Sequence, residues 1–402
     1  MPIPSAILGG VSLPPAVFER HGLRVERTSE EECLEARAGA WDRLALQAPQ
    51  RLPRLSHAWT FWLLHHSRDN APAVAADFGG EQTAEPWCCL FASRGDELVG
   101  VLPMVAMRQR PRLGFARRAV GPPRGPRETC GDLLLAPGPD GVSALAALSS
   151  VAAESFPHPM CLELDQVYDS SPTLRAVRAG VPGMLALVET STPVSYLPIQ
   201  GRYDDYRARL SAHLRKNLRN CRNRCERLAG SAYEFFDGPE AWRELDRFAA
   251  VEASGWKGRE GSAIASTSAT LAYYRSLTRM LAARGWLEFG FFRAEGRTLA
   301  AQMNVRFNRV LFGLRMAYDE GFEQLSPGRL LFERSLQRAF ESGQVDELNT
   351  GSDHAWQRDW QMRQRECWNV RVFPRRPLSF LLGFLPARLR SWARQGRRGR
   401  PS

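Results

Sequence analysis

Residues 325–343 read LSPGRLLFERSLQRAFESG, in which Ser-Pro-Gly separates one apolar residue from an amphipathic segment. Ser326 suits a helix N-cap, Pro327 suits the first helical position, and Gly343 suits a helix end. Apolar residues recur along one helical face at Phe332, Leu336, Ala339 and Phe340. The stretch predicts a capped helix that follows a strand at 310–318.

Gly328 is the residue that capping leaves unexplained. A glycine in the first turn costs a helix about 0.5–1 kcal/mol relative to alanine. It leaves the backbone bare, and free N–H groups at a helix start attract anions. Arg329 adds a positive charge beside it. Two interpretations stay open at this point, ordinary capping and a seat for a phosphate-bearing cofactor.

Length and composition limit the class of protein. The chain has 402 residues, 44% of them hydrophobic, which suits about two domains. The N-terminus has no basic start followed by a long apolar run, so we expect no signal peptide. The apolar stretch 378–389 contains Gly383 and Pro386 and is shorter than the roughly 20 residues of a membrane span. We expect a cytoplasmic protein, either soluble or bound peripherally at the inner face of the cell membrane.

Charge and cysteine content narrow the function further. The net charge is +11, and eight arginines with no acidic residue lie between Arg375 and the end of the sequence. Without them the charge is +3 (11 minus 8), so the rest of the chain is nearly balanced. The eight cysteines form no Cys-x-x-Cys pair, although Cys221 and Cys225 share a predicted helix face. They are interpreted as reduced packing thiols, and no metal site is predicted.

Periodicity and turn residues predict an irregular lead-in at 1–20, units at 21–195 and 200–375, and a tail at 376–402. The first unit is expected to contain helices at 30–48, 55–66 and 141–155, and strands at 87–93, 98–107 and 131–137. The second is expected to contain helices at 206–230, 239–254, 268–284 and 327–343, a loop from 256, and strands at 286–292, 298–307, 310–318, 345–349 and 366–373.

The two units share a hairpin pattern. Gly95, Leu98, Val99 and Gly100 match Gly296, Leu299, Ala300 and Ala301 at a constant offset of 201 residues. The same order of helix, hairpin and strand on both sides favours a duplicated architecture. We predict an α/β (α+β) fold of two tandem units, each with a mixed, mostly antiparallel sheet flanked by helices.

Four patches of the second unit stand out together. They are a basic helix with Arg215, Lys216, Arg219 and Arg222; Glu252-Ala-Ser-Gly-Trp256-Lys257-Gly258, ending at Gly261; Tyr318-Asp319-Glu320 with Ser326-Pro327-Gly328; and Gly351-Ser352-Asp353 through Asp359-Trp360. The combination resembles acyltransferases of the GNAT superfamily, and more narrowly its CelD-like (BioF2-like) branch, often linked to bacterial polysaccharide production. The resemblance covers residues 200–373 closely and 55–190 more loosely.

The resemblance implies tandem GNAT-like units, as in the related FemAB-type peptidyl transferases, and acyl-CoA (acetyl-CoA or longer) as cosubstrate. In the superfamily the loop between the fourth strand and the next helix binds the CoA pyrophosphate, and that loop corresponds here to 324–331. The residues implied in cofactor binding are Ser326, Pro327, Gly328, Arg329 and Leu330. Two departures are visible: Gly328 alone remains of the usual glycine pattern, and Trp356-Gln357 stands where the branch commonly has Tyr-Lys.

Acyl transfer from a thioester requires a deprotonated acceptor, a polarised carbonyl and a departing thiolate. Because no Gly-x-Ser-x-Gly or Cys/His pattern is present, we predict direct attack rather than a covalent acyl-enzyme. Asp353 is the first candidate for general base or acceptor positioning, with a helix cap as an equal alternative. His354 is the next candidate, since imidazole suits proton transfer near neutrality. Backbone N–H groups at 316–318 are expected to polarise the carbonyl.

Other candidates carry open alternatives. Asp319 either orients the acceptor or caps a turn, while Glu252 and Lys257 either bind the acceptor or pair with each other. Trp256 and Tyr318 are candidate substrate contacts.

The basic helix offers Arg215, Lys216 and Arg219 as contacts to an anionic substrate or to CoA phosphates, with solvated side chains as the alternative. It lacks an interleaved aromatic row and any DNA-binding motif, so nucleic acid is not favoured. A charged tRNA donor, as in the FemAB-type relatives, is the exception left open.

The tail repeats apolar residues at helical spacing, namely Phe380, Leu381, Phe384, Leu385, Leu389 and Trp392, among arginines at 388, 390, 394, 397, 398 and 400. A basic amphipathic segment with a Trp suits the surface of an anionic membrane. The alternatives are a disordered tail or a helix docked on the protein.

Three functions follow. The first is an acyl-CoA-dependent N- or O-acyltransferase acting on a cell-envelope or polysaccharide precursor. The second is an aminoacyl-tRNA-dependent peptidyl transferase of the same fold. The third is a catalytically silent GNAT-like scaffold in polysaccharide assembly.

Overall fold

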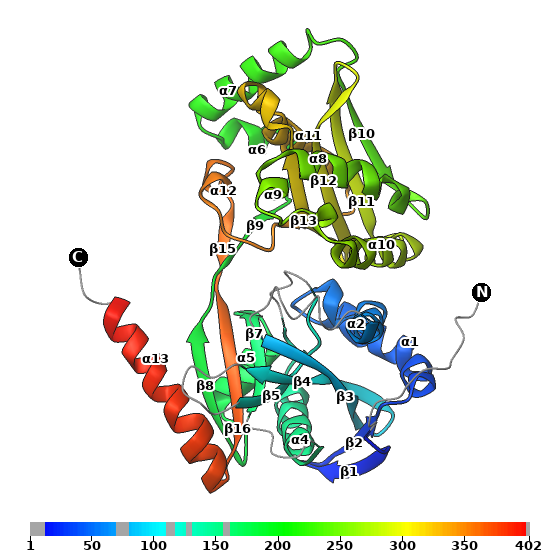
Figure 1. Cartoon of the computed structure of the whole chain (residues 1–402). Helices are drawn as coiled ribbons and strands as arrows, with labels where there is room; N and C mark the ends of the chain where they lie inside the picture. The colour runs from blue at the N-terminus through cyan, green and yellow to red at the C-terminus, as the bar shows by residue number, and fades with distance from the viewer. Residues whose placement is uncertain (1–12, 70–79, 110–116, 126–130, 156–160, 399–402) are drawn as a thin grey trace. The chain divides into compact units, whose positions relative to one another are not determined.

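The computed structural model describes residues 13–69, 80–109, 117–125, 131–155 and 161–398. The chain forms two compact units, Met1–Ser191 with Glu366–Ser402, and Thr192–Arg365 (Figure 1). The predicted boundaries at 195 and 375 differ from these, because sheet pairing decides the membership of two strands. Val194–Pro198 (β9) pairs in the second sheet, and Cys367–Pro374 (β16) pairs in the first.

The first unit is built on one sheet with strand order β1-β2-β3-β4-β5-β7-β16-β8 and with β6 beside β4. Its pairs are antiparallel except for β5 with β7, which is parallel. The strands are β1 (Ala16–Arg20), β2 (Leu23–Thr28), β3 (Gly80–Arg94), β4 (Glu97–Gln109), β5 (Arg117–Gly121), β6 (Leu134–Leu135), β7 (Cys161–Tyr168), β8 (Met184–Thr190) and β16. The helices are α1 (Glu31–Gln47), η1 (Pro53–Leu55), α2 (His57–Asp69), α4 (Pro139–Ser155), α5 (Pro172–Ala179), η5 (Ser379–Phe384) and α13 (Leu385–Arg398).

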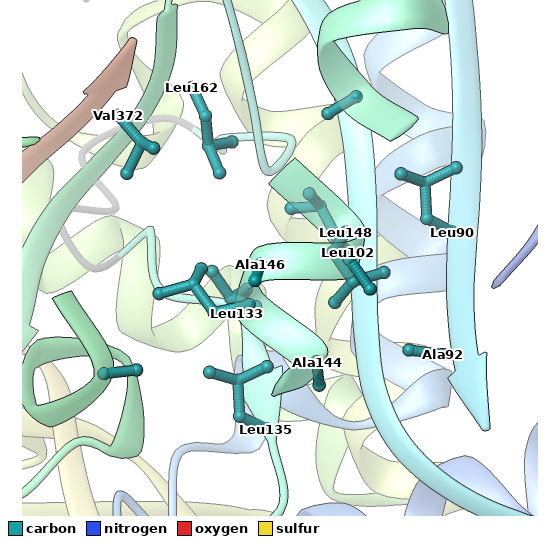
Figure 2. Packing of buried hydrophobic residues seen from close by; sticks show 14 of the residues in the cluster. Leu90, Ala92, Leu102, Leu133, Leu135, Ala144, Ala146, Leu148, Leu162 and Val372 are labelled. Atoms are coloured by element: carbon teal, nitrogen blue, oxygen red, sulfur yellow. The ribbon is translucent and has the colours of Figure 1, made fainter. Parts of the chain in front are cut away.

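The core of the first unit lies between its sheet and α4. Leu90 of β3, Leu102 of β4 and Leu148 of α4 belong to one buried cluster (Figure 2). The alanines of α4 let the helix approach the sheet closely: a Cβ on Gly100 would lie 3.0 Å from that of Ala144. This part of the fold therefore needs small residues on both sides of the contact.

The predictions for the first unit fit its helices better than its strands. The helices expected at 30–48, 55–66 and 141–155 are α1, α2 and α4. The strand expected at 131–137 is only the two-residue β6, and the lead-in expected at 1–20 already contains β1.

The second unit has a sheet of order β10-β11-β12-β13-β14-β9-β15, in which only β13 and β14 are parallel. Its strands are β9, β10 (Ala232–Asp237), β11 (Leu287–Ala294), β12 (Arg297–Phe307), β13 (Val310–Tyr318), β14 (Glu347–Asn349) and β15 (Arg363–Arg365). Its helices are α6 (Tyr203–Arg209), α7 (Ala212–Cys225), η2 (Ala241–Glu244), α8 (Leu245–Ser254), α9 (Trp256–Arg259), η3 (Ile264–Ser266), α10 (Ser268–Ala283), η4 (Glu320–Leu325), α11 (Pro327–Ser342) and α12 (Ala355–Asp359).

Helices pack against this sheet in two groups. In one, α8 contacts β12 and β13, and α10 contacts β11; in the other, α11 contacts β11, β12 and β13 and also packs against α6 and α7 (Figure 1). The apolar face predicted on the basic helix is confirmed, since Leu214, Leu218, Cys221 and Cys225 are all in the core of this unit. The predicted α/β class with two sheet-based units is thus confirmed.

Two predictions about helices in this unit were wrong. The single helix expected at 206–230 breaks at Leu210, which has extended backbone, because Ser211 begins a new helix by accepting a hydrogen bond from the Leu214 N–H (3.1 Å). The loop expected from 256 is the short helix α9.

The duplicated hairpin is present in both sheets, but its offset is 200 rather than 201. Arg94 pairs with Glu97 in the first hairpin, and Ala294 pairs with Arg297 in the second, a difference of 200. The sequence match aligned Gly95 with Gly296, but Gly95 is the first residue of its turn and Gly296 is the second. Both have positive φ.

Candidate active site

The last residues of β13 form the centre of the candidate site. β13 pairs along its length with β12, but it pairs with β14 only from Val310 to Phe312. A bulge between Gly313 and Arg315 interrupts the ladder with β12. Bulges turn a strand, and beyond this one no described strand pairs with β13 on its β14 side. Residues 313–318 are called the open edge below.

The direction of the backbone groups along the open edge follows from the ladder. The Asp319 N–H donates to the Leu299 carbonyl (2.8 Å), so the backbone N–H and C=O groups of odd-numbered residues here point toward β12. Because successive residues of an antiparallel pair alternate, the N–H groups of Met316 and Tyr318 face away from β12. Lys257 Nζ donates to the Met316 carbonyl (2.7 Å), as this alternation requires. The N–H groups predicted to polarise a carbonyl are thus directed toward the open edge.

A buried ion cluster supports the open edge from the α8 side. Glu252 is buried, and its Oε1 accepts from Lys257 Nζ (3.1 Å) and Arg315 Nε (2.8 Å). Its Oε2 accepts from the Ile264 N–H (2.7 Å). Burial opposes the charge of Arg315, but the Tyr274 hydroxyl and Glu252 outweigh it and raise the pKa of Arg315. The sequence left open whether Glu252 and Lys257 bind the acceptor or pair with each other. In the structure they pair, and this ion pair fixes Lys257 at the open edge.

The short helix α9 is held on both sides. A Cβ on Gly258 would lie 1.9 Å from the Ala253 carbonyl oxygen, so only glycine fits there. Glu320, just after β13, accepts from the Trp256 N–H (2.8 Å) and from Arg259 (2.7 Å). Trp256 itself remains exposed. These contacts keep Lys257 beside β13.

The start of α11 is seated on the open edge. The nearest atoms to a Cβ on Gly328 would be those of Tyr318 at 3.5 Å and the Met316 sulfur at 3.8 Å. These are ordinary contact distances, and the φ of Gly328 is not positive, so the fold would accept alanine here. The glycine therefore has no structural requirement within the described residues.

The first-turn amides of α11 are fewer than expected. Ser326 is at the N-cap position with a left-handed φ of 51°, and its side chain makes no capping bond to the described residues. Its carbonyl accepts from the N–H groups of Arg329 (3.1 Å) and Leu330 (3.2 Å). Pro327 has no N–H. The Gly328 N–H is therefore the one first-turn donor that is not bonded to the Ser326 carbonyl. The free N–H groups expected at this helix start are therefore reduced to the Gly328 N–H, and Gly328 itself is buried.

Asp319 and Asp353 are both anchored by hydrogen bonds. Asp319 accepts from the Gly321 N–H (2.9 Å), which is the turn-capping alternative. Asp353 accepts from Ser195 Oγ (2.8 Å) and Gln364 Nε2 (2.8 Å), and these bonds lower its pKa. The helix-cap alternative for Asp353 was wrong, because His354 takes the N-cap position of α12. The Asp353 carboxylate instead connects β9 to β15, because Ser195 lies in β9 and Gln364 lies in β15.

The segment that departs from the family pattern packs on α11. Trp356 and Trp360 both make edge contacts with Phe332, with ring centroids 5.1 and 5.0 Å apart. Gln357 is buried, and its Oε1 accepts from the His354 N–H (2.6 Å). Arg329 pairs with Asp359 at 3.3 Å. Trp356-Gln357 therefore fixes the Asp353 loop against the helix that begins at the open edge.

The basic helix α7 lies against α11 and η4. Arg215, Lys216 and Arg219 are exposed, whereas Arg222 points inward and donates to the buried Glu333 of α11 (2.6 Å). Three exposed cations are therefore carried by a helix that contacts the segment before α11.

A pocket that the sequence did not predict lies on the α6 and α7 side of α11. Its volume is about 610 Å³, and its lining includes Arg207, Arg222, Arg334 and Arg338 around Glu333. The signal that was missed is Glu333, a charge directly beside the apolar stripe of α11. No group of three His, Cys, Asp or Glu able to hold a metal occurs within the described residues.

Comparison with known proteins agrees with this geometry. Residues 212–361 match the model of the acetyltransferase (GNAT) domain. This segment is a GNAT domain. Comparison with curated sequences finds no match.

Solved structures extend the likeness to both units. One described as FemX is 13% identical, with a TM-score of 0.53 over 80% of this chain and 96% of its own. A conserved protein of unknown function from Bacteroides thetaiotaomicron is also 13% identical, with a TM-score of 0.50 over 84% and 97%. A tandem GNAT protein from the clavulanic acid pathway is 14% identical, with a TM-score of 0.46 over 88% and 99%. The predicted fold of two tandem GNAT-like units, related to the FemAB type, is confirmed.

Proposed function

We propose that the chain is a GNAT-type acyltransferase that moves an acyl group from acyl-CoA directly to an amine or hydroxyl of a cell-envelope or polysaccharide precursor. The observation that carries the proposal is the open edge of β13 with the start of α11 seated on it, inside a segment that matches a GNAT domain. The acceptor class rests on the resemblance to the CelD-like branch.

The donor is held along the open edge. Its diphosphate lies at the start of α11, near the Gly328 N–H and Arg329, and draws further charge from Arg215, Lys216 and Arg219. Its thioester carbonyl accepts from the N–H groups of Met316 or Tyr318, which are fixed by the ladder with β12 and need no rearrangement during reaction. Trp256 and Tyr318 border the acyl group or acceptor.

The reaction is a direct displacement. The acceptor nitrogen or oxygen attacks the thioester carbon, the C–S bond breaks, and the thiolate takes the proton that the acceptor gives up. Negative charge develops on the carbonyl oxygen, where the fixed ammonium of Lys257 stabilises it. Glu252 acts as a positioning residue because it pairs with Lys257, and Arg315 acts through Glu252, whose carboxylate it shares with Lys257.

Asp353 is proposed to orient the acceptor rather than to remove its proton. Hydrogen bonds from Ser195 and Gln364 lower its pKa, and a weakly basic carboxylate is a poor general base near neutrality. A charged carboxylate attracts a protonated amine or a hydroxyl donor. Asp319 keeps its turn-capping role after β13.

An aminoacyl-tRNA donor is the second candidate. The exposed cations of α7 favour it, because phosphate contacts supply most of the affinity for nucleic acid. The third candidate is a catalytically inactive scaffold in polysaccharide assembly, which would have the same fold but catalyse no reaction.

The test is to titrate the purified full chain with CoA, acetyl-CoA, pantetheine and charged tRNA, and to follow thiol release with model amines and sugars. The proposal expects CoA species to bind at least about tenfold more tightly than pantetheine, which lacks their phosphates, and acetyl-CoA to release thiol. Binding of charged tRNA alone selects the second candidate. Binding of none of them selects the scaffold.

A further inference from the structure

The C-terminal segment presents two different faces. Its inward face carries Ser379, Gly383, Phe384, Ala387 and Ser391, all buried. η5 packs against β16 and α13 against β8, and the Phe384 ring meets Phe373 at 5.6 Å (Figure 1). Small residues and one phenylalanine thus fix the segment to the first unit.

The outward face carries the larger apolar residues. We call it the leucine face, and it consists of Leu378, Leu381, Leu382, Leu385, Leu389 and Trp392. Leu378 is 66% exposed, Leu382 63% and Trp392 76%. An ordinary surface helix has the opposite arrangement, with its large apolar residues toward the core.

Exposed apolar residues are concentrated here. Outside this segment, which also exposes Phe380, the exposed large hydrophobic residues in the described part of the chain are Val17, Leu46 and Trp256. Isolated exposed residues are normal on soluble proteins, whereas a contiguous apolar patch marks an interaction site. The leucine face is such a patch.

The charge around the leucine face identifies what covers it. Arg375, Arg376, Arg388 and Arg390 are exposed beside it, and no acidic residue occurs from 375 to the end of the sequence. A protein partner or a second copy would need to supply matching acids, whereas an anionic bilayer supplies them everywhere. No described helix is long and apolar enough to cross a membrane.

We propose that the leucine face docks on an anionic lipid bilayer, lying in its interface with Trp392 at the headgroup level. The leucines bury apolar area among the acyl chains, and the arginines contact lipid phosphates. The inward face stays on β8 and β16, so docking brings the folded first unit to the membrane surface. This inference is independent of the proposed acyl transfer.

The test is flotation of the full chain with vesicles of phosphatidylcholine alone and of phosphatidylcholine mixed with phosphatidylglycerol. We expect binding to the mixed vesicles only. Leu381→Glu with Leu389→Glu should lower the partition coefficient by at least about tenfold, and Arg388→Ala by about fivefold with a weaker dependence on salt. Leu46→Glu, which changes an equally exposed leucine outside the face, should leave binding unchanged.

Three results would overturn the proposal: equal binding to both vesicle types, binding unaffected by the paired leucine change, or no binding at all. Light scattering of the same variants adds a further check. A concentration-dependent dimer that the leucine changes abolish would assign the face to a second copy of the chain and also overturn it. Since all these leucines are exposed, circular dichroism should show every variant folded.

Discussion

The two sheets differ at the place where a strand pairs in parallel with the next strand of its sheet. In the second unit β13 pairs with β14 only from Val310 to Phe312 and then leaves it. In the first, β5 pairs in parallel with β7 at Ala119 and Val120, and the chain returns to bridge β7 further along. There Gly131 exchanges two backbone hydrogen bonds with Asp165, at 2.8 and 3.2 Å. In the first unit Gly131 thus adds a bridge to β7, whereas the second unit has no described bridge of this kind to β14.

The helices that follow show the same contrast. α4 begins Pro-Asp-Gly, and a Cβ on Gly141 would lie 2.3 Å from the Ala136 carbonyl oxygen. α11 begins Pro-Gly, and a Cβ on Gly328 would meet nothing closer than 3.5 Å. The first glycine is required by packing and the second is not. This difference fits the proposal that the second unit, and not the first, binds the donor at its helix start.

The largest effect should come from Glu252→Ala, which removes the anion from the cluster behind the open edge. Arg315 and Lys257 would be left without their shared partner, at a cost of about 3–5 kcal/mol in unfolding free energy. Urea denaturation measures it. Asp246→Ala, which breaks the exposed pair with Arg275, is the control and should cost about 0.5 kcal/mol or less. Equal losses would show that the cluster does not support the edge.

Lys257→Met should separate support from chemistry. Because the ammonium is fixed at the Met316 carbonyl, its loss should lower kcat by about 10²–10³ while the Kd for acyl-CoA changes less than about threefold. Thiol-release kinetics and calorimetry give the two values. An unchanged kcat would remove Lys257 from the mechanism.

Paired alanine substitutions test the contrast between the helix starts. Gly141→Ala should destabilise the protein by about 1–3 kcal/mol through its backbone clash, without changing donor affinity. Gly328→Ala should raise stability by up to about 1 kcal/mol, yet weaken acyl-CoA binding at least about tenfold, because its methyl group would stand over Met316 and Tyr318. Thermal unfolding and calorimetry decide. Tight donor binding by Gly328→Ala would contradict the seat at α11.

The smallest effect on stability is expected for Asp353→Asn. Since the folded pKa of Asp353 is lowered, its contribution is present above the unfolded value of about 3.9 and is lost as pH falls through the folded value. The variant should be less stable by under about 1 kcal/mol at pH 7, with the difference vanishing in acid. If Asp353 orients the acceptor, the acceptor KM should rise about tenfold with kcat little changed. A collapse of kcat alone would make it the base.

Sequence patterns reached much of this fold for physical reasons. α11 was predictable because Pro327 at its start, its apolar stripe and Gly343 at its end are local signals, although Ser326 makes no capping bond. The break at Leu210 was missed because Leu210, Leu214 and Leu218 keep helical spacing across it. Strand β16 was assigned to the wrong unit, because the sequence of a strand does not indicate which strand it pairs with.

The candidate site was predictable only in part. The Glu252-Trp256-Lys257 patch and the Ser-Pro-Gly turn are short segments that the sequence displays. The open edge depends on a bulge at 313–315 and on where β14 ends, neither of which has a local signature. Asp353 takes its partners from Ser195 and Gln364, and only the folded sheet brings these together.

Hydrogen–deuterium exchange with and without saturating acetyl-CoA tests the central claim most directly. If the donor lies on the open edge of the second unit, exchange should slow at Met316, Tyr318 and Gly328. The equivalent positions of the first unit, 119–121 and 139–142, should stay unchanged. Protection in the first unit, or none at Met316 and Tyr318 under saturation, would contradict the account.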